Sequence, residues 1–167
     1  SCSKKCKISS KLMSQSENLF ETQCLKAHNL YRTQHGCPPL QLNQNLSSFA
    51  SKWALKMATN NKLEHSSGHN YGENIYMARG TQIDGEMPVK AWYSEVKDYN
   101  YGAAKFSPKT GHFTQVIWKN STELGVGIAR KGDASFVVAS YSPAGNVQGD
   151  FKANVPPLVP QKSPQTK

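Results

Sequence analysis

Two histidines and two glutamates are the side chains of this sequence best suited to chemistry. His112 lies in the aromatic and apolar run 111–121, and His65, Glu73 and Glu95 precede it. Imidazole nitrogens and carboxylate oxygens are ligands of Zn²⁺ and similar ions, and two histidines with a carboxylate can leave a position open to water. The spacings are long and no local motif such as His-Glu-x-x-His fixes them. The four side chains could therefore close on one divalent cation or form a hydrogen-bonded cluster.

The other three histidines, His28, His35 and His69, have sequence contexts that differ from those of His65 and His112. His28 lies within a helical pattern, which favours a hydrogen-bonded packing residue. His35 lies close to the expected end of that helix, where a partial positive charge is favoured. His69 is near enough to His65 in the sequence to compete with it as a metal ligand.

Catalytic motifs are absent from the sequence. It contains no Gly-x-Ser-x-Gly elbow, no cysteine in a nucleophile context and no glycine-rich phosphate loop. We therefore assign no catalytic residue and expect a binding protein rather than an enzyme. A metal-dependent hydrolase is the alternative, in which the four residues would hold Zn²⁺ and one glutamate would act as a general base.

Hydrophobic periodicity predicts the elements that must position these residues. The pattern favours four helices and three strands, with loops over 60–70 and 99–106. The first helix should begin at an N-cap on Ser16 and end before Gly36. Gly125 and Gly127 within one strand indicate close approach of another backbone. The expected helices span 16–35, 44–59, 86–97 and 112–118, and the expected strands span 72–78, 124–129 and 135–141.

Length and charge favour one globular core with two basic tails. The chain has 167 residues, and 37% of them are apolar. It has no apolar run of the roughly 18 residues that a membrane-spanning helix needs. We divide it into a basic disordered tail at 1–16, a core at 17–151 and an unfolded Pro/Lys-rich tail at 152–167. The net charge is +9, and the two tails contain seven lysines and no acidic residue.

This charge distribution excludes some partners and favours others. Proteins that read nucleic acids place their charge on a folded face, so we expect no nucleic acid partner. Basic tails suit an anionic membrane surface, where each lysine contributes about 1 kcal/mol. They could equally be solvated segments that aid solubility. The N-terminal lysines that would contact the membrane are Lys4, Lys5, Lys7 and Lys11.

Four cysteines are too few for a disulfide framework. Cys24 lies on the apolar face of the first helix and is expected to be a buried thiol. A bridge from Cys24 to Cys37 would be geometrically awkward. Cys2 and Cys6 lie among lysines, and they could be joined to each other, acylated or free. A cysteine beside a polybasic segment is typical of a two-signal membrane anchor.

Five blocks of the chain resemble the CAP superfamily of cysteine-rich secretory, antigen 5 and pathogenesis-related proteins. The resemblance implies an α+β fold, a three-layer α-β-α sandwich with a small central antiparallel sheet. It also implies that the family's metal-binding tetrad is His65, Glu73, Glu95 and His112, with zinc or another divalent cation. The resembling blocks are Cys24–Arg32, Leu63–Ser66 with Gly72–Tyr76, Trp92–Glu95, Gly111–Ser121 and Tyr141–Val147.

The chain departs from the secreted members in ways that narrow the function. It has no cysteine after Cys37 and has Ala139 where secreted members have a cysteine, so the family's sheet disulfides cannot form. The absence of a cysteine-rich C-terminal domain removes the channel-blocking function of some venom members. Arg79 stands where a serine nucleophile has been proposed in some relatives, which argues against a protease.

The chain is most similar to the Golgi-associated, plant pathogenesis-related branch, whose members are cysteine-poor. That resemblance implies a lipid or membrane-surface binding module on the cytosolic face of the Golgi. It implies sterol, fatty-acid or phosphoinositide ligands and self-association as a homodimer. The alternative is a secreted defence or allergen-like protein, in which a leader would precede Ser1 and Cys2 would pair with Cys6.

Overall fold

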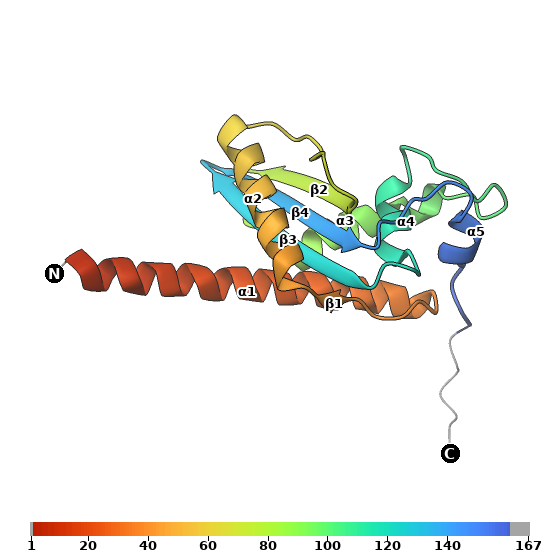
Figure 1. Cartoon of the computed structure of the whole chain (residues 1–167), viewed down its shortest axis with the longest axis horizontal. Helices are drawn as coiled ribbons and strands as arrows, with labels where there is room; N and C mark the ends of the chain where they lie inside the picture. The colour runs from red at the N-terminus through yellow and green to blue at the C-terminus, as the bar shows by residue number, and fades with distance from the viewer. Residues whose placement is uncertain (1, 161–167) are drawn as a thin grey trace, which may run out of the picture.

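The computed structural model describes residues 2–160, with side chains described from Lys11 onward. Its centre is one four-stranded sheet of order β1-β3-β4-β2 with helices on both faces (Figure 1). Strands β2, β4 and β3 are antiparallel, as predicted, and β1 adds a short parallel pairing to β3 that was not predicted. The predicted three-layer sandwich is confirmed. The strands are β1 Gln41–Leu42, β2 Gly72–Arg79, β3 Glu123–Lys131 and β4 Ala134–Ser142.

Helix α2, Gln44–Asn60, covers one face of the sheet. Its N-cap is Asn43, whose side chain accepts a hydrogen bond from the Leu46 N–H, and the chain leaves the helix in a left-handed conformation at Asn61. Alanines on its inner face let the helix lie close to the sheet, where they meet larger side chains of β4. This layer of the core contains Ala50, Ala54, Met57, Phe136 and Val138.

The close backbone approach predicted from two glycines of β3 is confirmed. A Cβ atom on Gly125 would lie 2.1 Å from the Leu46 carbonyl carbon, and one on Gly127 would lie 2.3 Å from the Ser51 nitrogen. Both glycines face α2. The strand therefore brings no side chain to this face where the helix backbone crosses it.

Helices α1, α3 and α4 cover the other face. They are α1 Cys2–Gln34, α3 Glu86–Tyr93 and α4 Gly111–Ile117, and a 3-10 helix, Ser94–Asp98, extends α3. The predicted helix over 86–97 is thus divided into two helix types. The core on this side of the sheet is larger and aromatic, with Phe20, Cys24, Trp92, Phe113 and Trp118 among its buried members.

The N-terminal segment differs from the predicted disordered tail. Helix α1 begins at Cys2, not at an N-cap on Ser16, and its first turns extend past the sheet (Figure 1). Once the packed second half of a helix has formed, each further residue adds a hydrogen bond without a new nucleation cost. Lys11 is exposed. The side chains of Lys4, Lys5, Lys7, Cys2 and Cys6 lie outside the described residues.

The C-terminal segment also differs from the predicted unfolded tail. Phe151–Asn154 form a short helix, α5, and Val155 is buried. The N–H of Val159 donates to the carbonyl of Gln34 at 2.9 Å, so the chain returns to the end of α1. The domain boundaries at 16 and 152 stay predictions. None of the helices described over residues 2–160 is long and apolar enough to span a membrane.

Cys24 and Cys37 are both buried free thiols, as the sequence predicted for Cys24. Burial raises the pKa of the Cys24 thiol far above its ordinary value. This cysteine is therefore a packing residue.

Candidate functional site

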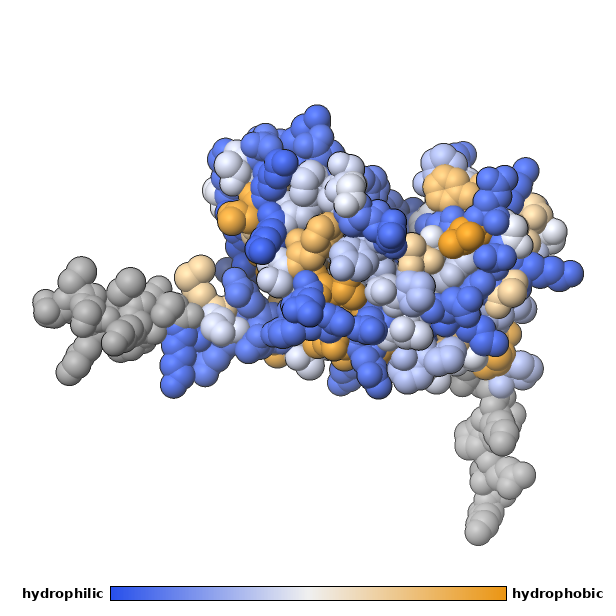
Figure 2. All heavy atoms as spheres, viewed as in Figure 1, coloured by the Kyte–Doolittle hydropathy of each residue, from blue (hydrophilic) through white to orange (hydrophobic). Residues whose placement is uncertain are grey.

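The two histidines singled out by the sequence line one cavity of about 330 Å³. It lies between the loop before β2, the start of β2, the start of α4 and the loop 143–150. In the space-filling view the outline of the molecule dips between the α2 side and the α4 side (Figure 2). The residues that line this cleft are His65, Glu73, Asn74, Phe106, Pro108, Gly111, His112 and Asn146.

His65 and Glu73 form the first pair at the cleft. His65 Nδ1 lies 2.8 Å from Glu73 Oε1, and the backbone N–H of Ser66 donates to the same oxygen at 2.9 Å. The Glu73 side chain is only 5% exposed. Burial alone would raise the pKa of Glu73, but the hydrogen bonds from His65 and Ser66 outweigh burial and lower it. The hydrogen bond to Glu73 raises the pKa of His65.

His112 and Glu95 form the second pair with a similar geometry. His112 Nδ1 lies 3.0 Å from Glu95 Oε2. The other carboxylate oxygen, Oε1, accepts the backbone N–H groups of His112 at 2.9 Å and of Phe113 at 3.0 Å. These are N–H groups at the start of α4, where a negative charge is stabilised. The 3-10 helix thereby presents Glu95 to the first turn of α4.

The four predicted ligands are arranged as two pairs, not as one closed tetrad. In the part of the chain that the structure describes, no three His, Cys, Asp or Glu side chains gather closely enough to hold a metal ion. Each glutamate engages Nδ1 of its histidine, which leaves Nε2 of both rings without a hydrogen-bond partner among the described residues. The donor set fits a cation held by two imidazoles with a carboxylate behind each. It does not fit four direct ligands.

A buried hydrogen-bond chain connects the cleft to the core. His28 Nε2 lies 2.6 Å from the Tyr141 hydroxyl, which accepts from Asn74 Nδ2 at 3.3 Å. Asn74 Nδ2 also donates to the His112 carbonyl at 3.1 Å. Burial lowers the pKa of His28 to about 4, so its ring is neutral and Nδ1 donates to the Cys24 carbonyl. His28 is the packing residue that the sequence predicted.

Two residues that the sequence did not single out brace the cleft. Asn146 Nδ2 donates to the Gly111 carbonyl at 2.9 Å, and Thr114 Oγ1 donates to Asn146 Oδ1 at 2.5 Å. The loop after β4 therefore holds the start of α4 in position. Both residues lie inside the blocks 111–121 and 141–147, but only the fold shows that they contact each other.

His35 and His69 have their ring nitrogens engaged elsewhere. His35 is buried, and its two nitrogens contact the Pro156 carbonyl and the Tyr93 hydroxyl, each at 2.8 Å. Burial lowers the pKa of His35, so the partial positive charge expected there is not favoured. His69 contacts the Ser66 hydroxyl and the Tyr71 backbone.

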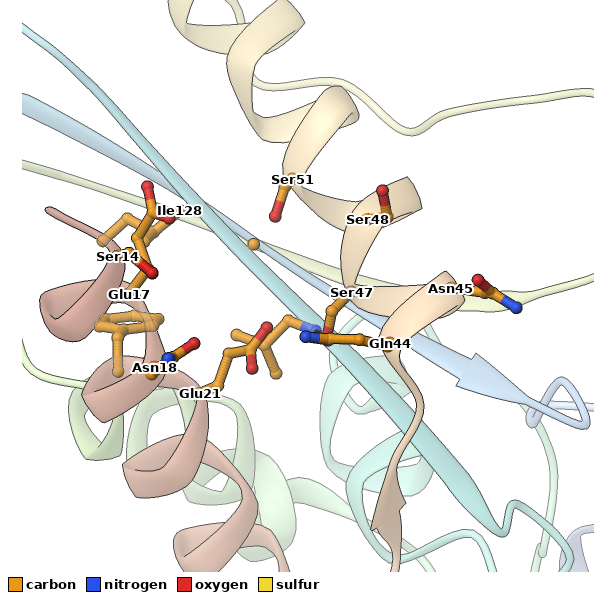
Figure 3. Close-up of a pocket in the computed structure, with 13 residues that line it drawn as sticks. Ser14, Glu17, Asn18, Glu21, Gln44, Asn45, Ser47, Ser48, Ser51 and Ile128 are labelled. Atoms are coloured by element: carbon orange, nitrogen blue, oxygen red, sulfur yellow. Dashed lines mark hydrogen bonds between the residues drawn. The ribbon is translucent and has the colours of Figure 1, made fainter. Parts of the chain in front are cut away.

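A larger cavity of about 500 Å³ lies between α1 and α2 over β3. Figure 3 shows Glu21 reaching from α1 towards Ser47 on α2. Burial, offset in part by a hydrogen bond with Ser47, and the charge of Glu17 together raise the pKa of Glu21. The other polar residues on its walls are Ser14, Asn18, Gln44, Asn45, Ser48 and Ser51. No sequence pattern pointed to this cavity.

Comparison with known proteins gives a consistent set of relatives. The model of the cysteine-rich secretory protein family, CAP, matches residues 25–141. Golgi-associated plant pathogenesis-related protein 1 of Homo sapiens is 45% identical over 149 residues, which cover 86% of this chain and 95% of that protein. Pathogenesis-related protein 1 of Arabidopsis thaliana is 34% identical and covers 73% of this chain and 75% of that protein.

A fungal relative and two solved structures extend the comparison. Protein PRY2 of Saccharomyces cerevisiae is 37% identical and covers 84% of this chain but 42% of its own length. BmVAL-1 has a TM-score of 0.65 at 21% identity and covers 76% of this chain and 78% of that chain. NaASP2, in a crystal structure with Zn²⁺, has a TM-score of 0.62 at 22% identity and covers 78% of this chain and 82% of that chain. These two structures support the fold.

Proposed function

The chain belongs to the CAP family of cysteine-rich secretory proteins, and from that membership we propose that it is a binding module for lipid surfaces whose cleft holds a divalent cation. The observation that carries the proposal is the orientation of the two cleft histidines. In each, a carboxylate engages Nδ1, which keeps the proton there and leaves the Nε2 lone pair available. A cation bound there would supply positive charge with which an anionic headgroup can pair.

The surface beside the cleft supports a lipid partner. Phe106 lines the cleft and is 54% exposed, and Val147, next to the cleft residue Asn146, is 46% exposed. Lys105 and Lys109 are exposed on the same loop as Phe106. Exposed apolar side chains beside lysines suit the boundary between headgroups and acyl chains of an anionic membrane. The basic residues 4–11 of the N-terminal segment would add to this attraction.

The location proposed for the protein follows its relatives' names. The human relative is named as Golgi-associated, and another relative, from Candida albicans, is named as the secreted protein RBT4. The paucity of cysteines fits a reducing compartment, and we therefore favour the cytosolic face of the Golgi over secretion. Sterols, fatty acids and phosphoinositides are the lipids proposed as ligands.

Zinc titration tests the cation site. Isothermal titration of the full chain near neutral pH should show one saturable Zn²⁺ site, and His112→Ala should abolish it. His69 is half-buried and its ring nitrogens contact Ser66 and Tyr71, so it offers no substitute ligand. Heat signals that do not saturate at one equivalent, or that persist in His112→Ala, would reject the site.

Vesicle flotation tests the lipid surface separately. The full chain is mixed with phosphatidylinositol-containing liposomes at physiological salt, and the double variant Lys105→Glu/Lys109→Glu is compared with Lys26→Glu/Lys52→Glu, which changes charge equally on exposed helix positions. The first variant should float markedly less than the second. Equal flotation of the two variants would show that the loop with Lys105 and Lys109 does not contact the membrane.

A further inference from the structure

We propose that Ser66 and His69 are positioning residues, which fix the carboxylate of Glu73 and through it the tautomer of the cleft ligand His65. The proposal rests on the proposed cation site, because it assigns the residues that prepare one of its two imidazoles. Neither residue belongs to the tetrad implied by the sequence. Ser66 follows His65 directly, and His69 lies in the same loop.

The backbone N–H of Tyr71 sets the direction of the hydrogen bonds in this loop. The backbone N–H of Tyr71 can only donate, and it lies 3.1 Å from His69 Nδ1. His69 Nδ1 therefore accepts, and the proton of the neutral ring is on Nε2. His69 Nε2 lies 2.6 Å from Ser66 Oγ, so this contact is a donation from the ring to the hydroxyl oxygen.

The serine transmits this direction to the glutamate. Because Ser66 Oγ accepts from His69, its own proton is directed to Glu73 Oε2, with which it forms a short hydrogen bond. Glu73 Oε1 is left for two donors, the Ser66 N–H and His65 Nδ1. The two carboxylate oxygens thus have separate tasks. Exchange between them would require both Ser66 contacts to break.

This series of hydrogen bonds ends at Nε2 of His65, the nitrogen proposed to bind the cation. With His65 Nδ1 donating to Glu73, the lone pair of the ring is on Nε2. The two histidines of the loop are thereby held in opposite tautomers: His69 carries its proton on Nε2, and His65 carries its proton on Nδ1. His69 Nε2 has no lone pair to give to a metal, which removes His69 as the rival ligand.

The same directions exclude His69 as a general base for Ser66. A general base must accept the serine proton, whereas His69 donates to Ser66 Oγ. The ring of His69 is also held from its sides by aromatic residues, since its centroid lies 4.9 Å from that of Phe49 and 5.5 Å from that of Tyr71. The hydrogen bond between Ser66 and His69 therefore runs in the opposite direction from the one that a serine and histidine pair of a hydrolase needs.

The second histidine of the cleft provides an internal control. Glu95 is fixed by the backbone N–H groups of His112 and Phe113, and apart from His112 no side chain among the described residues hydrogen-bonds to its carboxylate. A change at Ser66 or His69 should therefore alter His65 and leave His112 unchanged. A general loss of structure would affect both.

Nitrogen-15 NMR of the histidine rings in the cation-free full chain tests the proposal. In the wild-type protein His65 should be in the Nδ1–H form and His69 in the Nε2–H form. Ser66→Ala and His69→Phe should each convert His65 to a mixture of tautomers, with the His112 spectrum unchanged. His69→Gln, whose amide N–H can still donate to Ser66, should restore the Nδ1–H form.

Zinc titration of the same variants supplies the second readout. Ser66→Ala and His69→Phe should weaken Zn²⁺ binding about 10-fold, and His69→Gln should recover most of the loss. A His65 ring that stays in the Nδ1–H form in both variants overturns the positioning role. If the wild-type chain binds no zinc, the proposed cation site fails, while the NMR comparison still decides whether Ser66 and His69 position His65.

Discussion

Arg32 on α1 donates through Nη1 to the backbone carbonyl of Trp118, 2.8 Å away across the core. The same guanidinium also donates to the carbonyls of Pro38, Val116 and Ser121. Arg32 is fully buried, and burial lowers its pKa. Its charge is matched by carbonyl dipoles at the end of α4, where a cation is favoured. The first helix thereby holds the segment that follows the cleft histidine.

Replacement of Arg32 should therefore destabilise the fold. Arg32→Met fills the space but leaves several buried carbonyls without donors, and each orphaned group costs about 1–3 kcal/mol. Partial relaxation should reduce the total, and we expect the free energy of unfolding to fall by about 2–4 kcal/mol. Urea denaturation measures this, with Lys26→Met on the exposed side of α1 as control. A loss no larger than that of the control would show that the carbonyls find other partners.

The fate of Arg32 illustrates which parts of the structure a sequence can predict. Repeating patterns are local, and they predicted α2, the β3–β4 pair and the close approach at Gly125 correctly. An arginine in the last turns of a helix is, by pattern, an exposed residue. Its burial depends on carbonyls from a loop far along the chain, and no periodicity carries that information.

The candidate site was predictable in its residues but not in its connections. The residue types, together with the blocks that resemble the family, identified His65, Glu73, Glu95 and His112 as candidates. Three of these four residues line the cleft. The pairing of each glutamate with one Nδ1 depends on backbone N–H groups, which every residue except proline possesses. The predicted helix start at Ser16 was wrong for a different reason, because a local cap signal competes with helix propagation from a packed segment.

Gly127 should not tolerate a side chain. An added Cβ would lie 2.3 Å from the Ser51 nitrogen, which belongs to the helix backbone and cannot rotate away. Gly127→Ala should therefore push α2 from the sheet and cost about 1–3 kcal/mol of unfolding free energy. Gly102→Ala is the matched control, because its nearest neighbour is a side-chain oxygen at 3.3 Å. Equal melting temperatures for the two variants would contradict the close approach.

His28 should make the fold sensitive to mild acid. Its pKa is lowered from 6.5 to about 4 by burial, so the unfolded chain binds a proton between these values that the folded chain does not. Stability should fall as pH decreases through this window, by about 1.4 kcal/mol per pH unit for one proton. His28→Gln removes the titrating group. The stability difference between wild type and His28→Gln should shrink on acidification from pH 6.5 to 4, and a constant difference in urea denaturation would refute this.

Glu95→Gln should impair zinc binding through the tautomer of His112. The backbone N–H groups of His112 and Phe113 must still be accepted by an oxygen, so the amide oxygen takes the place of Oε1. The amide NH₂ then faces His112 Nδ1 and donates to it, which moves the ring proton to Nε2, the nitrogen needed for the cation. We expect Zn²⁺ affinity to fall about 10–100-fold in calorimetry, with the ring in the Nε2–H form by NMR. Asp98→Asn, at the exposed end of the same 3-10 helix, is the control. Unchanged affinity with a shifted tautomer would show that His112 is not a ligand.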